Sequence, residues 1–174
     1  MNAYQAILTL RAVRHFQDLP LPGEVLTRIL QAGRWTGSAK NTQPWQFVVV
    51  RDRQMLDNLA ACGHYAGHLR GAAVVVVIVM KAGWSGSFDS GRVTQNMMLA
   101  AWVEGVGSCI ASLQEEERAR SLLGVPADHR IQTSISFGYP LPDAPRTIEG
   151  RPMEEILASL GRRSLEEIVH WDQW

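Results

Sequence analysis

The segment from Ala72 to Met80 contains only alanine, valine, isoleucine and methionine, and it has no polar residue. A strand with one solvent-exposed face would alternate apolar and polar residues, so this run predicts a strand that is covered on both faces. The run is far too short to cross a bilayer as a helix. We therefore expect it at the centre of a sheet that is flanked by helices.

The spacing of apolar residues elsewhere predicts the helices and strands around this central strand. Three- and four-residue apolar spacing favours helices, and short stretches rich in β-branched and aromatic residues favour strands. The predicted helices are 22–33, 53–61, 89–104, 114–123 and 153–160, and the other predicted strands are 45–50, 108–112 and 131–137. We expect Gly33 to help end the first helix. Residues 141–152, rich in proline and charge, are predicted to form a surface excursion.

The length and composition predict one soluble domain. A chain of 174 residues falls within the usual size of a single domain. Lys plus Arg and Asp plus Glu both number 17, so no net charge favours nucleic acid or a membrane surface as a partner. The two cysteines, Cys62 and Cys109, match neither a zinc pattern nor a disulfide framework. Because the N-terminus also lacks signal-peptide features, we expect a cytoplasmic protein.

Two polar segments carry residue types that suit ligand binding. Arg11 and Arg14 fall on one side of a predicted helical turn, where together they would hold a phosphate; the alternative is a solvated basic helix end. A loop before a predicted strand contains Ser38, Asn41 and Gln43, and amide side chains satisfy both donor and acceptor edges of a planar heterocycle. The alternative for this loop is an ordinary turn.

Two glycine-containing segments are further candidates. Residues 105–108, Gly-Val-Gly-Ser, would let the backbone approach a ligand, although a helix C-cap explains the glycines equally well. Residues 161–163, Gly-Arg-Arg, form either an anion clamp or solvent-facing charge. His64 and His68 have no matching zinc-ligand pattern, and Cys109 suits a small core residue better than a nucleophile. We expect no metal site, and no P-loop or G-x-S-x-G motif is present.

Taken in order, these segments resemble the nitroreductase family of FMN-dependent flavoproteins in its short form. The motifs that carry the resemblance are Arg-x-x-Arg-x-Phe, Ser-x-x-Asn-x-Gln-Pro-Trp, Asp-x-Gly leading into Gln-Asn-x-x-Leu-Ala-Ala, Gly-x-Gly-Ser, Gly-Tyr-Pro and Gly-Arg-Arg-x-Leu-Glu-Glu-Ile-Val-His-Trp, at 11–16, 38–45, 89–101, 105–108, 138–140 and 161–171. They cover nearly the whole chain, and the Asn-x-Gln-Pro-Trp block is the most specific.

The resemblance implies the architecture of the protein. The fold would be α+β, with a central mixed, mainly antiparallel sheet flanked by helices, in an interlocked homodimer. Residues 1–174 would form a single domain, and the tail 161–174 would pack on the partner subunit. Two FMN sites would be shared across the interface between the subunits.

The resemblance also implies which residues bind FMN. These residues are Arg11, Ala12, Val13, Arg14, Ser38, Asn41, Gln43, Ile110, Ala111, Ser112, Arg162 and Arg163. Arg14 would lie near the pyrimidine edge of the ring or the ribityl chain, and the backbone N–H groups of 110–112 would face the flavin N5 edge. Arg162, with Arg163, would clamp the phosphate.

This chain departs from the family pattern at three positions. The family often has an arginine and a hydroxyl residue where this chain has Leu10 and Ala12, and a basic residue where it has Leu160. We expect Arg11 and Arg163 to compensate at the phosphate end of the cofactor.

The implied function is FMN-dependent NAD(P)H oxidoreduction. NADH or NADPH would transfer a hydride to the flavin and leave, and a nitroaromatic, quinone or similar small-molecule acceptor would then bind, which predicts ping-pong turnover. The flavin supplies the reactive centre, so no dedicated catalytic residue is expected beyond Arg14, a proposed electrostatic stabiliser. The alternatives are a flavin-binding module without turnover and a flavin-fragmenting or reductively dehalogenating relative. Such a relative would take its lid from 81–88 or 141–152.

Overall fold

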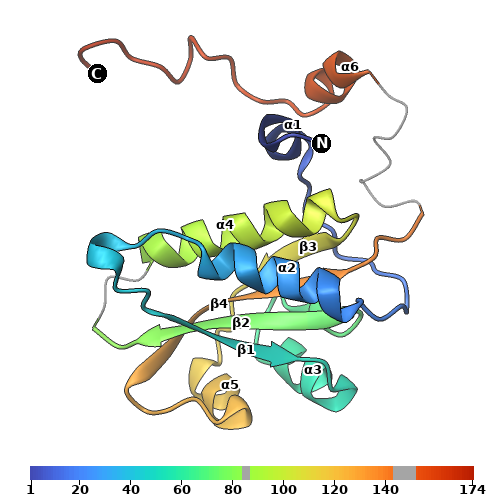
Figure 1. Cartoon of the computed structure of the whole chain (residues 1–174), viewed down its shortest axis with the longest axis vertical. Helices are drawn as coiled ribbons and strands as arrows, with labels where there is room; N and C mark the ends of the chain where they lie inside the picture. Colours follow the sequence, from blue (N-terminus) through green and yellow to red (C-terminus); the bar gives the residue numbers. More distant parts are fainter. Residues whose placement is uncertain (84–86, 143–151) are drawn as a thin grey trace.

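The computed structural model describes residues 1–83, 87–142 and 152–174, and its centre is an antiparallel sheet (Figure 1). The strands are β1 (Trp45–Val50), β2 (Val74–Lys81), β3 (Gly107–Ala111) and β4 (His129–Gly138). Their order across the sheet is β1-β2-β4-β3, so β1 and β3 lie at opposite edges. All four strands occur where the sequence predicted them, with ends that differ by at most a few residues.

Strand β2 confirms the prediction from the apolar run, because alternate residues enter two separate cores. Val76, Ile78 and Met80 pack in one core, whereas Val75 and Val77 pack in the other. Residues on a strand point alternately to the two faces of the sheet, so a strand between two helical layers needs apolar residues at every position.

Helices cover both faces of the sheet (Figure 1). They are α1 (Ala3–Thr9), α2 (Gly23–Arg34), α3 (Arg53–Ala60), α4 (Ser87–Val103), α5 (Glu116–Leu123) and α6 (Met153–Ala158). Helices α2 and α4 lie together on one face, and α3 and α5 lie on the other. The α+β fold class with a sheet between helices is therefore confirmed. None of the helices in the described part of the chain is both long and apolar enough to span a lipid bilayer.

Helix α1 was not predicted from the sequence. Asn2 caps its start by accepting a hydrogen bond from the Gln5 backbone at 2.9 Å. The Gln5 side chain accepts one from the Asn2 backbone at 3.0 Å. This reciprocal capping box satisfies two otherwise unpaired N–H groups at the start of a short helix.

Gly33 does not end its helix, contrary to the prediction. It lies within α2, and a Cβ atom at this position would come 2.7 Å from Met97 Cε and 3.1 Å from Phe47 Cζ. The glycine therefore lets α2 approach α4 and β1 closely.

The segment after α1 is extended, so the predicted helical turn carrying Arg11 and Arg14 is wrong. Ala12 pairs with Ser108 in a parallel bridge, and the Val13 N–H donates to the Ser108 carbonyl at 2.9 Å. These contacts add a short parallel element beside the edge strand β3, which agrees with a mixed, mainly antiparallel sheet.

Two glycines explain why this segment lies flat on the sheet edge. A Cβ on Gly107 would lie 2.7 Å from the Cβ of Val13, and a Cβ on Gly138 would lie 2.9 Å from Phe16 Cδ1. Each distance is too short for an unstrained contact, so only glycine gives the two side chains room. Val13 is fully buried as a result.

The C-terminal part of the chain extends away from the sheet (Figure 1). Helix α6 confirms the predicted helix at 153–160, and the residues from Gly161 to Trp174 are exposed. Most of the predicted excursion at 141–152 lies outside the described residues, as do residues 84–86 of the predicted lid segment 81–88.

Candidate functional site

The residues that the sequence assigned to cofactor binding form two groups, near opposite edges of the sheet. The first group lies around the edge strand β3 and contains Arg11 to Arg14 and Ile110 to Ser112, with Arg162 near Arg11. The second group is the loop that contains Ser38, Asn41 and Gln43, directly before β1.

Arg11 is anchored at the end of α1 with part of its guanidinium unsatisfied. Its Nη1 donates to the carbonyl oxygens of Leu8 at 2.9 Å and Leu10 at 2.7 Å. Its Nη2 is buried and has no hydrogen-bond partner within the described residues. Burial lowers the pKa of Arg11, and the positive charge of Arg162 lowers it further. A buried donor without an acceptor is costly, so this nitrogen is suited to an incoming anion.

Arg11 and Arg162 together make a local positive site. Within the ranges that the structure describes, neither arginine forms an ion pair with a carboxylate. Two like charges that influence each other are unfavourable unless an anion lies near both. The charge and donors of this pair suit a phosphate group.

Arg14 lines a hollow of about 450 Å³ beside β3. His15, Phe16, Tyr65 and His68 line the same hollow. Arg14 also lies near the Cys109 thiol, where its charge partly opposes the rise in pKa that burial causes. Because Cys109 is buried and its pKa is raised, the thiol stays protonated at neutral pH, in agreement with a core role.

The outer edge of β3 is open beyond the bridge to Ala12. In the described part of the chain β3 pairs with β4 on one side, and on the other side only Ser108 is paired. Ile110 is 54% exposed although Cys109 and Ala111 on either side are buried. Beyond Ser108, the outer edge of β3 is thus unpaired in the described part of the chain.

The second group is held in a strained conformation. Lys40, Asn41 and Gln43 have φ values of 52°, 55° and 46°, which L-residues rarely adopt. The Gln43 N–H donates to Ser38 Oγ at 2.8 Å and closes the loop. Such backbone strain costs about 1–3 kcal/mol per residue and is concentrated at functional sites.

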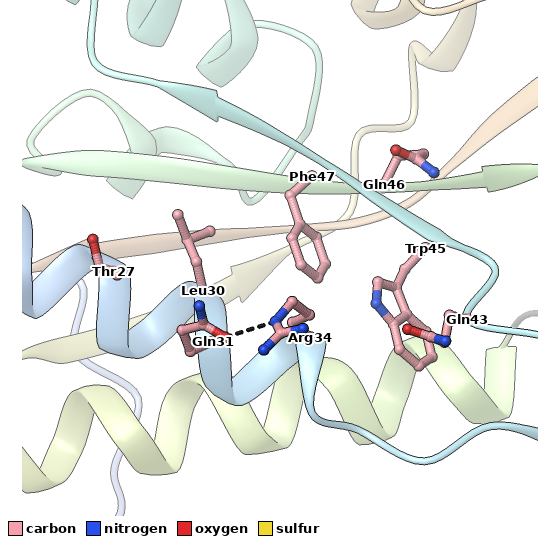
Figure 2. A pocket seen from close by; sticks show the side chains of 8 residues that line it. All are labelled: Thr27, Leu30, Gln31, Arg34, Gln43, Trp45, Gln46 and Phe47. Atoms are coloured by element: carbon pink, nitrogen blue, oxygen red, sulfur yellow. Dashed lines mark hydrogen bonds between the residues drawn. The ribbon is translucent and has the colours of Figure 1, made fainter. Parts of the chain in front are cut away.

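Gln43 lines a different hollow, of about 430 Å³, between α2 and β1 (Figure 2). Its other lining residues are Thr27, Leu30, Gln31, Arg34, Trp45, Gln46 and Phe47. In Figure 2 the Arg34 side chain is held by Gln31, with an Nε–Oε1 distance of 2.6 Å. None of the residues around Arg14 takes part in this hollow.

Helix α4 shows how far apart the two groups lie. Arg92, near the start of α4, donates to the Gly37 carbonyl at 2.7 Å. Trp102, near its end, donates to Thr9 Oγ1 at 2.9 Å. Ten residues of helix span about 15 Å. A single chain thus leaves the loop at one end of α4 and the arginines at the other.

Comparison with known proteins identifies the family. The Nitroreductase family model matches residues 7–64 and 57–139, which is more than half of the chain. The chain belongs to the nitroreductase family. A relative from Archaeoglobus fulgidus named "Putative NADH dehydrogenase/NAD(P)H nitroreductase" is 33% identical over 144 residues, which cover 77% of this chain and 83% of that protein.

Solved structures of nitroreductase-fold proteins agree with this membership. A crystal structure of a protein with the same name from Bacteroides thetaiotaomicron has a TM-score of 0.83 and 26% identity, and the match covers 99% of this chain and 98% of that one. The NADPH:FMN oxidoreductase of Vibrio harveyi in complex with NAD⁺ has a TM-score of 0.81 and 23% identity over 100% of this chain and 78% of that one. The second likeness concerns the fold alone.

Membership of the nitroreductase family confirms several predictions at once. The predicted family and fold are correct, and the protein is an enzyme, a flavin-dependent oxidoreductase of the NAD(P)H nitroreductase kind. FMN is named in two solved structures with this fold, an FMN-dependent nitroreductase from Clostridium difficile at 22% identity and the Vibrio harveyi oxidoreductase at 23%. The residue assignments, the dimer and the electron acceptor are taken up as proposals below.

Sequence reasoning missed two side chains near the hollow of Arg14. His68 was considered only as a metal ligand, and Ser136 was not considered at all, yet they lie 2.8 Å apart beside β3. Neither has a local sequence signal, because the two residues come from parts of the chain that meet only in the folded sheet. Among the described residues, no group of three or more His, Cys, Asp or Glu side chains could hold a metal ion.

Proposed function

We propose that this nitroreductase-family chain is an FMN-dependent NAD(P)H oxidoreductase that works as a homodimer, with each FMN held between two chains. The observation that carries the proposal is the separation of the two halves of the site along α4. Arg11, Arg14 and 110–112 of one chain would meet the loop at 38–43 of a second chain. Each half has groups that its own chain leaves unsatisfied or strained.

The residues present fit FMN by the chemistry of their donors. Arg11 and Arg162 would hold the phosphate, and Arg163 would add a further cation. Asn41 and Gln43 would supply amide donors and acceptors to the heterocycle from the second chain. The exposed edge at 110–112 would supply backbone N–H groups to the ring.

When bound, FMN would supply the redox chemistry by accepting two electrons from NAD(P)H and passing them to a second substrate. Arg14 would stabilise the negative charge that develops on the ring during reduction, because a fixed cation in a site from which water is excluded needs no reorganisation. The hollow beside Arg14 would position the pyrimidine end of the ring. Nitroaromatics, quinones or similar compounds are the proposed acceptors, with ping-pong turnover.

The exposed tail is proposed to complete the dimer. Leu165, Ile168, Val169, Trp171 and Trp174 are apolar and exposed in the single chain. Exposed apolar side chains that lie together mark protein–protein contacts, so we propose that these five are buried against a second subunit. We also propose a cytoplasmic location, because Cys62 and Cys109 are both free and buried.

Subunit complementation tests whether the site is shared. One chain carries Arg11→Ala, and a differently tagged chain carries Asn41→Ala with Gln43→Ala. Each homodimer is expected to bind FMN about 10-fold or more weakly, because each lost hydrogen-bonding group costs about 1 kcal/mol and those to charged groups cost more. The heterodimer is expected to regain one wild-type site per dimer, measured by FMN titration calorimetry.

The result that contradicts sharing is equally clear. If both halves belonged to one chain, the heterodimer would contain two weakened sites and no wild-type site. Arg118→Ala is the matched control, because Arg118 lies on α5 and pairs with Glu115 at 3.0 Å. Its FMN binding should equal that of the wild-type protein.

A further inference from the structure

His68 lines the hollow of Arg14 and has no role in the FMN site proposed above. It belongs to the 3₁₀ turn η2 (Gly67–Leu69) and is half-buried. Its Nδ1 lies 2.8 Å from Ser136 Oγ, and Ser136 Oγ donates to the Cys109 carbonyl at 3.2 Å. With its own proton directed to that carbonyl, the serine oxygen accepts from Nδ1–H of His68.

This hydrogen-bond chain leaves Nε2 of a neutral His68 as an unprotonated nitrogen. Nε2 is shielded from solvent and has no hydrogen-bond partner among the residues that the structure describes. An imidazole held through Nδ1 with a free Nε2 is the arrangement in which a histidine gains or loses a proton at a defined atom. The residue as a whole is half-buried and lines the hollow together with Arg14.

The charged and polar groups around His68 decide whether its imidazole is neutral or protonated. Arg14 is the nearest cation, and His15 and Tyr65 line the same hollow. Burial lowers the pKa of His68, the charge of Arg14 lowers it further, and the backbone carbonyl of Ile110 acts in the opposite direction. A histidine whose pKa lies below its ordinary value is neutral at neutral pH. His68 is therefore neutral until a negative charge arrives near it.

We propose that His68 takes up one proton when the site is reduced and releases it when the site is reoxidised. This inference rests on the proposed function, which places the FMN ring beside Arg14 and Ile110. His68 would thereby be a proton-handling residue for the oxidoreductase reaction, acting through charge and not through contact with the electron acceptor.

The step balances in charge and atoms. NAD(P)H delivers two electrons and one proton and leaves as NAD(P)⁺, so the site gains one negative charge. His68 then takes up a proton that the bulk solvent supplies as hydronium, which leaves one water molecule; an N–H bond forms at Nε2, and the net charge of the site is restored. When the acceptor removes two electrons and one proton, the Nε2–H bond breaks and the proton returns to the bulk solvent.

The midpoint potential of the FMN-loaded protein as a function of pH tests this proposal. For a two-electron couple, each proton taken up contributes about 30 mV per pH unit. Between the pKa of His68 in the oxidised protein and its higher pKa in the reduced protein, the wild-type slope should exceed that of His68→Gln by about 30 mV per pH unit. His15→Gln, a histidine substitution at the same hollow, should keep the wild-type slope.

A second measurement covers the case in which His68→Gln loses its cofactor. The pKa of His68 is followed by NMR of the histidine ring protons in oxidised and in anaerobically reduced wild-type holoprotein. The proposal expects a higher pKa after reduction. Equal slopes for wild type and His68→Gln, or an equal pKa in both redox states, would overturn it while leaving FMN-dependent turnover intact. A wild-type protein that binds no FMN would instead overturn the proposed function and this inference together.

Discussion

Removal of residues 162–174 is expected to give a monomer that retains no FMN. The tail carries Arg162 and Arg163 and five exposed apolar side chains, at positions 165, 168, 169, 171 and 174. Burying each large apolar side chain contributes about 1.5–3 kcal/mol. The summed burial free energy of these five side chains is thus comparable to the free-energy cost of bringing two subunits together, about 4–15 kcal/mol. Analytical ultracentrifugation and the flavin absorbance of the purified protein measure both losses.

Two matched variants separate the roles of the tail. Arg162→Ala with Arg163→Ala should leave the dimer intact and weaken FMN binding, because the apolar side chains remain. Ile168→Ser with Trp171→Ser should weaken the dimer although both arginines are present. A truncated protein that stays dimeric and yellow would refute the role of the tail.

Arg14→Ala is expected to slow the reduction of bound flavin by NAD(P)H about 100-fold, in line with the effect of removing one preorganised charge-stabilising group. Arg14 is exposed in the single chain and pairs with no carboxylate among the described residues. Its hydrogen bond to the buried Cys109 thiol involves a weak sulfur acceptor, so its loss costs little and the fold and dimer should persist. Anaerobic stopped-flow absorbance measures the rate.

Arg14→Lys is the control for this prediction. It keeps the positive charge but loses the planar guanidinium, so it should recover a large part of the rate. Equal flavin affinity and an equal reduction rate in wild type and Arg14→Ala would remove Arg14 from the proposed mechanism.

A sheet covered by helices on both faces could be predicted because the sequence of β2 is apolar at every position. Every residue from Val74 to Met80 is buried, and alternate residues contact different helical layers. A polar side chain at any of these positions would be buried between the sheet and a helix. The absence of polar residues therefore predicts helices on both faces of the sheet.

Local patterns failed where a distant contact decides the conformation. Arg11 and Arg14 have helical spacing, yet the chain between them is extended because Val13 and Phe16 fit against glycines of β3 and β4. A glycine near the end of an apolar helical pattern indicates a helix end. Gly33 instead lies inside α2, because Met97 and Phe47 leave no room for a side chain at this position. Helix α1 was missed because it is short, although Asn2 and Gln5 carried its capping signal.

The family resemblance predicted FMN sites shared between subunits, but the spacing of the motifs along the chain did not show that the two groups of residues lie apart within one chain. The loop at 38–43 and the arginines at 11 and 14 are near in sequence, yet they lie at opposite ends of α4 and beside opposite edges of the sheet. The strain at Asn41 and Gln43 was also hidden, because both residues occur in ordinary turns. His68 was hidden because its partner Ser136 is distant in sequence.

Anaerobic titration of the purified, FMN-loaded protein with NADH and with NADPH tests the central claim most directly. We expect at least one nicotinamide to bleach the flavin absorbance stoichiometrically, and a quinone or nitroaromatic added afterwards to restore it without further nicotinamide. A protein that binds no FMN, or whose bound FMN neither nicotinamide reduces, would contradict the assignment as an FMN-dependent NAD(P)H oxidoreductase.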